Sequence, residues 1–188
     1  MAKAMWKEGF AGILGALLVL LAQLGAQQLS VSLDLGLVSG SLALAAEKAP
    51  RDKTRKTPAL RSDVYEQLAE AQDLAAAGKT GEALKILDQL RDSQGRRALN
   101  SYELANMYNF YAFVYYQKEQ YARTIDAYQK LLQQPDIPVA MESSTYYSLA
   151  QLYFVTENYS QAIRYLKDWF NMAENPQPDA YVLLAQAY

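Results

Sequence analysis

Residues 143–174 read SSTYYSLAQLYFVTENYSQAIRYLKDWFNMAE, and the pattern of this stretch determines the fold. On both sides of Glu157 and Asn158, apolar side chains recur at intervals of three and four residues, which is the period of an amphipathic helix. Asn favours turns over helix interiors. The stretch therefore predicts two antiparallel helices joined by a turn. Ala150 and Ala162 are expected at their closest approach, because larger side chains there would hold the helices apart.

The spacing of this stretch occurs three times, and a fourth copy begins near the last residue. In each copy a small residue is followed by a bulky one three residues later, a small one after nine more, and bulky ones after four and three more. The copies are Ala71, Leu74, Ala83, Leu87 and Leu90; Ala112, Tyr115, Thr124, Tyr128 and Leu131; Ala150, Tyr153, Ala162, Leu166 and Trp169; and then Ala185 and Tyr188. Successive copies start 41, 38 and 35 residues apart. Constant spacing within a unit of about 35 residues predicts a solenoid of helix pairs, and therefore binding rather than catalysis.

The copies resemble tetratricopeptide repeats over about residues 63–188. The resemblance rests on the small and bulky positions above, on Tyr121 and Tyr159 in the turns, and on Pro135 and Pro176 at the repeat ends. The chain departs from the family pattern by Tyr or Leu in place of Trp and Gly on the first helix, and by Thr as the second small residue of the second copy. The resemblance implies an all-α, right-handed solenoid of antiparallel helix pairs over residues 62–188. Its concave groove would be lined by the other face of each first helix.

That groove face carries aromatic rings and amides. Rings can bury the apolar side chains of an extended peptide, while Asn and Gln can hydrogen-bond its backbone. The resemblance implies a partner-binding role for Asn106, Asn109, Phe113, Tyr116, Gln117, Tyr147, Gln151, Phe154, Asp179, Val182 and Gln186. The set contains no Lys or Arg, so recognition of an acidic C-terminus is not expected. The alternative is that these rings pack against neighbouring helices.

Composition argues against an enzyme. The chain has no cysteine, which excludes disulfides, thiolate metal sites and cysteine nucleophiles. It also has no histidine, the side chain most used for proton transfer near neutral pH and the commonest metal ligand. No glycine-rich phosphate loop occurs, so neither a cofactor nor a metal is predicted. Acidic side chains outnumber basic ones from residue 62 onward, which argues against binding of nucleic acid.

The first 46 residues predict an export signal. Lys3 and Lys7 precede an apolar run over residues 10–26, a second apolar stretch covers residues 29–46, and Ala43-Leu44-Ala45 supplies a small-x-small cleavage site. The alternative is an uncleaved anchor in the inner membrane, because a run of 17 residues is at the short limit for a bilayer span. A cytosolic protein is the least favoured alternative. The repeats are therefore expected in the periplasm.

Residues 47–61 predict a flexible linker between the signal and the repeats. From Lys48 to Arg61 there are six basic residues and one acidic residue, and Pro50 and Pro58 interrupt the segment. Such a segment is too charged to collapse onto a core. A solvated spacer is favoured over contact with anionic lipid.

The leading functional hypothesis is a scaffold that holds protein partners in a bacterial cell envelope. The signal, the basic linker and tyrosine-rich stretches such as NMYNFYAFVYYQKEQY (106–121) together resemble the periplasmic tetratricopeptide proteins found with proteobacterial TonB energy-transduction systems. That resemblance implies TonB, ExbB and ExbD as partners. The alternatives are an accessory factor for outer-membrane, pilus or peptidoglycan assembly, and the binding domain of a longer envelope enzyme.

The last copy of the pattern predicts an apolar helix face without a second helix to cover it. This face would comprise Val182, Leu183, Leu184, Ala185 and Tyr188. Solenoids normally end in a polar cap. A fragment of a longer repeat protein is therefore expected, with the pairing of this end with a partner as the alternative.

Overall fold

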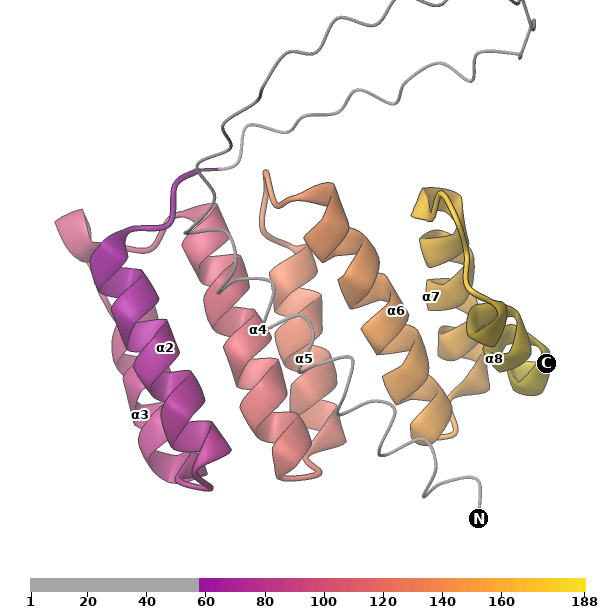
Figure 1. Cartoon of the computed structure of the whole chain (residues 1–188), viewed down its shortest axis with the longest axis horizontal. Helices are drawn as coiled ribbons and strands as arrows, with labels where there is room; N and C mark the ends of the chain where they lie inside the picture. Colours follow the sequence, from indigo (N-terminus) through magenta and orange to yellow (C-terminus); the bar gives the residue numbers. More distant parts are fainter. Residues whose placement is uncertain (1–57) are drawn as a thin grey trace, which may run out of the picture. The chain divides into compact units, whose positions relative to one another are not determined.

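The computed structural model describes residues 58–188, and this part of the chain is entirely helical, without strands. Figure 1 shows its seven α-helices and one short 3-10 helix. The α-helices are α2 (Ser62–Ala76), α3 (Thr80–Arg91), α4 (Ser101–Gln117), α5 (Tyr121–Leu132), α6 (Val139–Val155), α7 (Tyr159–Met172) and α8 (Pro178–Ala187); the 3-10 helix is η1 (Gly95–Arg97). The all-α prediction is thus confirmed for these residues. The predicted signal or anchor and most of the predicted linker lie outside the described residues.

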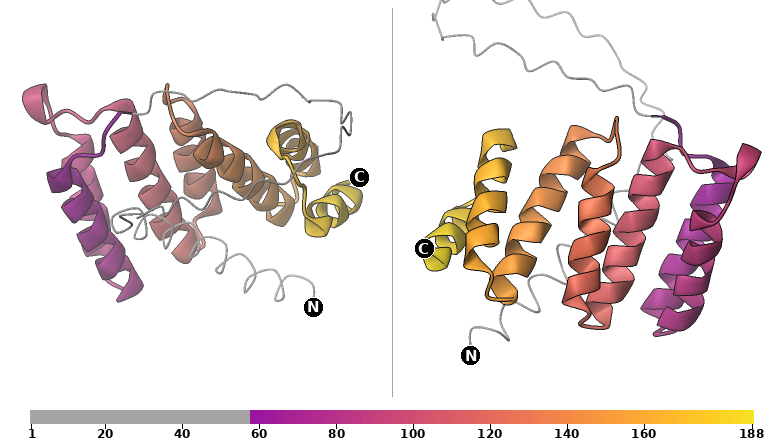
Figure 2. Two further views of the ribbon diagram at one scale, coloured as in Figure 1. Left: turned by 45° about the horizontal axis from the view of Figure 1, so that its top comes forward. Right: turned by 180° about the vertical axis from the view of Figure 1, so that it is seen from behind.

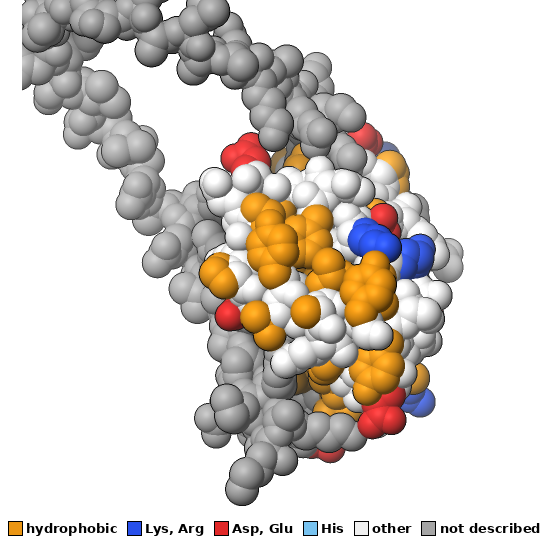
Figure 3. All heavy atoms as spheres, turned by 90° about the vertical axis from the view of Figure 1, so that its right-hand side faces the viewer, with side chains coloured by type: hydrophobic (Ala, Val, Ile, Leu, Met, Phe, Trp, Pro, Cys, Tyr) orange, Lys and Arg blue, Asp and Glu red, His pale blue; other side chains and the backbone are white. Residues whose placement is uncertain are grey.

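The helices pack as consecutive pairs, as the repeated spacing predicts. α2 packs on α3, α4 on α5 and α6 on α7, and the pairs follow one another in a row with α8 against α7 (Figures 1 and 2). The small residues of the three complete copies are 0–1% exposed: Ala71 and Ala83, Ala112 and Thr124, Ala150 and Ala162. Such burial is expected where two packed helices approach closely. The end of the row at α7 and α8 presents a cluster of apolar side chains (Figure 3).

Each pair turns through one residue with a left-handed backbone at the same position of the copy. These residues are Gly78, Glu119 and Glu157, with φ of 78°, 55° and 63°. In the first turn the Gly78 N–H donates to the carbonyl of Ala75 over 3.0 Å and the Lys79 N–H to that of Leu74 over 2.8 Å. Equivalent bonds occur in the other two turns, and this pattern satisfies the last carbonyls of the first helix.

The predicted turn residues are confirmed with small shifts. In the first pair the left-handed residue is Gly78, a residue type that adopts positive φ without steric cost. In the third pair the left-handed residue is Glu157, and Asn158 instead caps α7 by accepting a hydrogen bond from the Gln161 N–H at 3.4 Å. Tyr121 and Tyr159, expected in the turns, are the first residues of α5 and α7.

Polar contacts also join one pair to the next. The Tyr111 hydroxyl of α4 donates to Oδ1 of Asp88 in α3 over 2.6 Å. The Gln129 amide of α5 donates to the Tyr153 hydroxyl of α6 over 3.0 Å. Leu87 of α3 and Leu131 of α5, on the same helices as Asp88 and Gln129, are fully buried.

The start of α4 is closed by a capping box. The Asn100 side chain accepts a hydrogen bond from the Glu103 N–H at 2.9 Å, and the Glu103 carboxylate accepts one from the Asn100 N–H at 2.9 Å. The two residues thereby satisfy two N–H groups that the helix itself leaves without partners. Asn100 is therefore the capping residue of α4.

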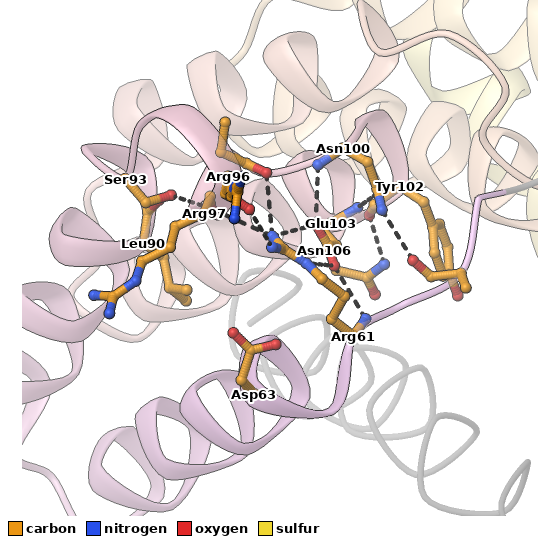
Figure 4. A network of polar contacts seen from close by, with 12 residues as sticks. Arg61, Asp63, Leu90, Ser93, Arg96, Arg97, Asn100, Tyr102, Glu103 and Asn106 are labelled. Carbon is orange, nitrogen blue, oxygen red and sulfur yellow. Dashed lines mark hydrogen bonds and ion pairs between the residues drawn. The ribbon is translucent and has the colours of Figure 1, made fainter.

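Arg61 ties the beginning of α2 to this cap (Figure 4). Its guanidinium donates from Nε to Oε1 and from Nη2 to Oε2 of Glu103, both at 2.9 Å, and its backbone N–H donates to Oε1 at 3.0 Å. The same guanidinium donates to the carbonyls of Arg96, Arg97 and Ala98. The sequence interpretation assigned Arg61 to the flexible linker. In the structure this residue is the N-cap position of α2 and is fixed to residues 35–42 positions later.

The carboxylate of Glu103 is fully buried, and these bonds keep it ionised. Burial by itself would raise the pKa of the Glu103 carboxyl, but the hydrogen bonds from Arg61 and from the backbone N–H of Asn100 outweigh burial and lower it. A bidentate pair with Arg is the geometry that best offsets the loss of hydration of a carboxylate. This pair therefore holds the first helix pair to the second.

Candidate partner-binding surface

The predicted site residues occupy equivalent positions on three helices. Relative to the small residue of each first helix, they lie six and three residues before it, and one, four or five residues after it. The small residues are Ala112 in α4, Ala150 in α6 and Ala185 in α8. We call the surface formed by these positions the first-helix face. Its eleven members divide into buried amides, half-buried rings and exposed side chains.

The amides of α4 and α6 on this face are buried. Asn106 and Gln151 are 0% and 3% exposed, and Asn109 is also buried. The Asn106 amide donates to the carbonyl of Tyr102 over 2.7 Å. Within the described part of the chain, Asn106 Oδ1 and Gln151 Oε1 have no hydrogen-bond partner. In this conformation these three amides do not present themselves to a peptide backbone, contrary to the geometry that the sequence interpretation assumed.

The rings four residues after the small residue close the turns of their own pairs. The Tyr116 ring lies 5.9 Å from that of Tyr121 at 51°, and the Phe154 ring lies 5.4 Å from that of Tyr159 at 64°. Phe113 is half-buried as well. Packing between helices, which the sequence interpretation kept as its alternative, therefore occupies Tyr116 and Phe154.

Tyr147 of α6 brings α7 and α8 into the same surface. Its ring lies 4.9 Å from that of Trp169 in α7. Burial raises the pKa of the Tyr147 hydroxyl, and the carboxylate of Asp179 in α8 raises it further. A hydrogen bond with the Gln151 side chain acts in the opposite direction and lowers this pKa. Tyr147 therefore remains a neutral hydrogen-bond donor at neutral pH.

The pKa of the Tyr116 hydroxyl on α4 is raised as well. Burial is the largest cause, followed by the neighbouring Tyr121 and the Glu119 carboxylate, and together they raise the pKa of Tyr116 to about 12. Both tyrosine hydroxyls of the face are thus suited to hydrogen bonding and not to proton transfer near neutral pH.

Four of the predicted residues are exposed, and three of these lie on α8. They are Gln117 at the end of α4, and Asp179, Val182 and Gln186 on α8. Asp179 of α8 is also the member whose carboxylate raises the pKa of Tyr147 in α6. The accessible part of the predicted site is concentrated there.

The sequence interpretation missed an aromatic chain that continues from Tyr147. The Trp169 ring lies 5.1 Å from that of Phe170, and the Phe170 ring lies 4.8 Å from that of Tyr181 in α8. Helical spacing places Trp169 and Phe170 on the apolar face of the second helix, but it does not predict which rings they contact. The adjacent aromatic pair WF and the tyrosine at the start of the last copy were the available signal.

Three further observations concern the described residues outside this face. No group of three or more acidic residues there is arranged to hold a metal ion, and no helix there is long and apolar enough to span a membrane. A hollow of about 500 Å³ lies along α2, lined by the Tyr65 ring, by aliphatic side chains and by the carboxylates of Glu66, Glu70 and Asp73. This hollow is separate from the first-helix face.

No protein-family model, curated protein or solved structure matches this chain. The assignment of a function therefore rests on the residues and geometry described above.

Proposed function

We propose that this chain is a non-enzymatic protein-interaction scaffold, a right-handed solenoid of tetratricopeptide type that binds a segment of a partner protein on the first-helix face. The observation that supports this proposal is the chain of ring contacts that links Tyr147 of α6, through Trp169 and Phe170, to the start of α8. Asp179, Val182 and Gln186 are exposed on that helix, and the Asp179 carboxylate raises the pKa of Tyr147. Residues of two different repeats thus contribute an aromatic ring, a carboxylate, an apolar side chain and an amide to one surface. Such mixed surfaces suit peptide segments.

The chemistry of this surface defines the partner segment. The Val182 and Tyr147 side chains favour an apolar residue, and the carboxylate of Asp179 favours a donor or a basic group. The predicted set has no cation to receive a carboxylate. The partner segment is therefore neutral or basic, with at least one large apolar side chain.

The proposed location is the periplasm, with an inner-membrane anchor as the alternative state of residues 1–46. The support is the order of basic and apolar residues and the small-x-small site at Ala43-Leu44-Ala45. The resemblance to tetratricopeptide proteins of TonB systems extends the proposal to TonB, ExbB or ExbD as partners. Cell fractionation combined with the mass of the mature N-terminus tests the location and separates a cleaved signal from an anchor.

Site-specific photocrosslinking tests the proposed surface. A photoreactive amino acid is introduced at Val182, which is 49% exposed, and in a matched variant at Val139, which is 39% exposed at the start of α6 and outside the predicted set. We expect one dominant crosslinked protein from Val182 in intact cells and none from Val139. Mass spectrometry of that product distinguishes components of a TonB system from outer-membrane, pilus or peptidoglycan assembly factors.

Two results would contradict the proposal. Equal crosslinking from both positions would show contact without a defined surface. A product from Val182 that persists after Asp179→Lys and Gln186→Glu are introduced together would show that the exposed residues of α8 do not recognise the partner. Both substitutions are at exposed positions, so the fold is expected to tolerate them.

A further inference from the structure

Two seams join the three helix pairs α2–α3, α4–α5 and α6–α7. The first seam lies between α3 and α4, and the second seam lies between α5 and α6. The residues two and five positions before the small residue of a first helix are buried in both α4 and α6. They are Phe110 and Met107 in α4, but Ser148 and Thr145 in α6. Ser148 interacts with Tyr128 of α5, so the second seam contains small hydroxyl side chains at these positions.

A buried hydroxyl also enters the second seam from α5. Tyr128 is fully buried, and the equivalent residue of α3 is Leu87. Within the described residues the Tyr128 hydroxyl makes no hydrogen bond of ordinary length. Burial raises the pKa of Tyr128, and its neighbour Ser148 across the seam acts in the opposite direction. A buried polar group with an imperfect hydrogen bond costs free energy, and water removes that cost when the group becomes exposed.

The polar contacts at the two seams differ in strength as well. At the first seam the Tyr111 hydroxyl donates to the Asp88 carboxylate over 2.6 Å, and Arg91 pairs with the same carboxylate at 2.8 Å. At the second seam the neutral Gln129 amide donates to the Tyr153 hydroxyl over 3.0 Å. Hydrogen bonds to an ionised group are roughly twice as strong as neutral ones. The first seam is further closed because α2 also packs on α4.

We propose that the second seam is a hinge of the row, about which the helices α2–α5 and the pair α6–α7 move as two bodies. Opening of this seam hydrates the hydroxyls of Tyr128, Ser148 and Thr145 and breaks a neutral hydrogen bond. Opening of the first seam instead exposes the large apolar side chains of Met107 and Phe110, for which water offers no compensation. The second seam therefore opens at the lower cost, and hinges lie where opening costs least.

The hinge changes the width of the first-helix face. Phe113 of α4 lies on one side of the second seam, and Tyr147 and Gln151 of α6 lie on the other. Movement about the seam therefore changes the distance between the predicted residues of the two helices. The hinge is a property of the folded row and does not rest on the proposed function.

Distances between spin labels test the hinge. The chain has no cysteine, so two introduced cysteines carry the only labels. Lys85→Cys with Asp126→Cys spans the first seam, and Asp126→Cys with Arg164→Cys spans the second. The three positions are exposed and equivalent, each two residues after the small residue of α3, α5 or α7, so the two label pairs are matched. Double electron–electron resonance on the full chain is expected to give a distance distribution roughly twice as wide across the second seam.

Removal of the buried hydroxyls tests the cause of the movement. Tyr128→Phe and Ser148→Ala together leave the second seam apolar at this contact, and replacement of both polar partners by apolar groups favours the closed state. We expect the excess width across the second seam to fall by about half in this double variant, and by less in Tyr128→Phe alone. Thr124→Val is the matched control, because it removes a fully buried hydroxyl within the α4–α5 pair, and it leaves both distributions unchanged.

Three outcomes overturn the proposal. Equal widths across the two seams show that the second seam is no more mobile than the first. A wide distribution that the double variant leaves unchanged, in a chain of unaltered helicity by circular dichroism, shows that the buried hydroxyls do not govern the movement. Narrowing of the same size in Thr124→Val assigns the movement to the α4–α5 pair itself.

Discussion

The left-handed residues show how single positions determine the geometry of a helix pair. Glycine adopts this conformation without steric cost, whereas other residues lose roughly 1–2 kcal/mol in it. The first pair uses Gly78, and the next two use Glu119 and Glu157 at the equivalent position. The turn therefore persists without glycine because two hydrogen bonds to the end of the first helix stabilise it in each pair.

Gly78→Ala isolates the backbone requirement of the first turn. A Cβ added at Gly78 meets no atom within 4 Å, so its effect arises from φ of 78° alone. We expect a loss of about 1 kcal/mol in the free energy of unfolding, measured by urea denaturation. Gly81→Ala is the matched control, because its Cβ also meets no atom but its backbone is helical. That variant is expected to gain about 0.5 kcal/mol. Equal effects of the two changes would contradict a left-handed turn at Gly78.

Glu103→Gln tests the buried ion pair through the pH dependence of stability. The folded-state pKa of Glu103 lies below the unfolded value, so its stabilising contribution is present above the unfolded pKa and is lost as pH falls through the folded pKa. We expect the variant to lose about 2–4 kcal/mol at neutral pH. Its free energy of unfolding should also decline less steeply than that of the natural chain between about pH 5 and 3.

The control for this measurement is Glu66→Gln on the exposed side of α2, which is expected to alter neither the stability nor its pH dependence appreciably. If Glu103→Gln retained the pH dependence of the natural chain, a group other than Glu103 would be responsible for the loss of stability in acid.

At the scale of elements, the sequence predicts contacts within a helix pair far better than contacts between pairs. Helical spacing identifies the buried alanines, and Gly78 and Asn100 mark the boundaries, because these signals are local. The bond of Arg61 to Glu103 joins residues that are 42 positions apart in the sequence, so no local sequence pattern predicts it. Likewise, spacing shows that Asn106 in α4 and Gln151 in α6 lie on equivalent sides of their helices. It does not show how deeply the neighbouring helices bury those sides.

Ala150→Leu tests the closest approach of α6 and α7. Ala150 and Ala162 are both fully buried there, so a leucine forces the helices apart or into strained rotamers. We expect a loss of about 2–3 kcal/mol in the free energy of unfolding. The matched change is Ala185→Leu, at the equivalent but exposed position of α8, where we expect an effect within about 0.5 kcal/mol. Similar losses at both positions would show that helix propensity or the denatured state is responsible instead of packing.

At the scale of the whole described unit, stability is expected to be graded along the row of helices. In repeat architectures each unit contacts mainly its neighbours, so terminal elements have fewer stabilising contacts than central ones. α4 packs against α2, α3 and α5, whereas α8 packs mainly against α7. The first pair is additionally held by the bonds of Arg61 to the start of α4. The two ends of the row are therefore not equivalent, and the end at α8 is the weaker.

Hydrogen exchange measured by mass spectrometry tests this gradient. We expect the amides of α8 to exchange fastest among α2–α8 and those of α4 to exchange slowest, because α8 packs mainly against one helix and α4 packs against three. Glu103→Gln should accelerate exchange in α2 and α3 and leave α7 and α8 unchanged, since the bonds it removes join only the first two pairs. Uniform exchange across all seven helices would instead indicate that the row unfolds as one cooperative unit.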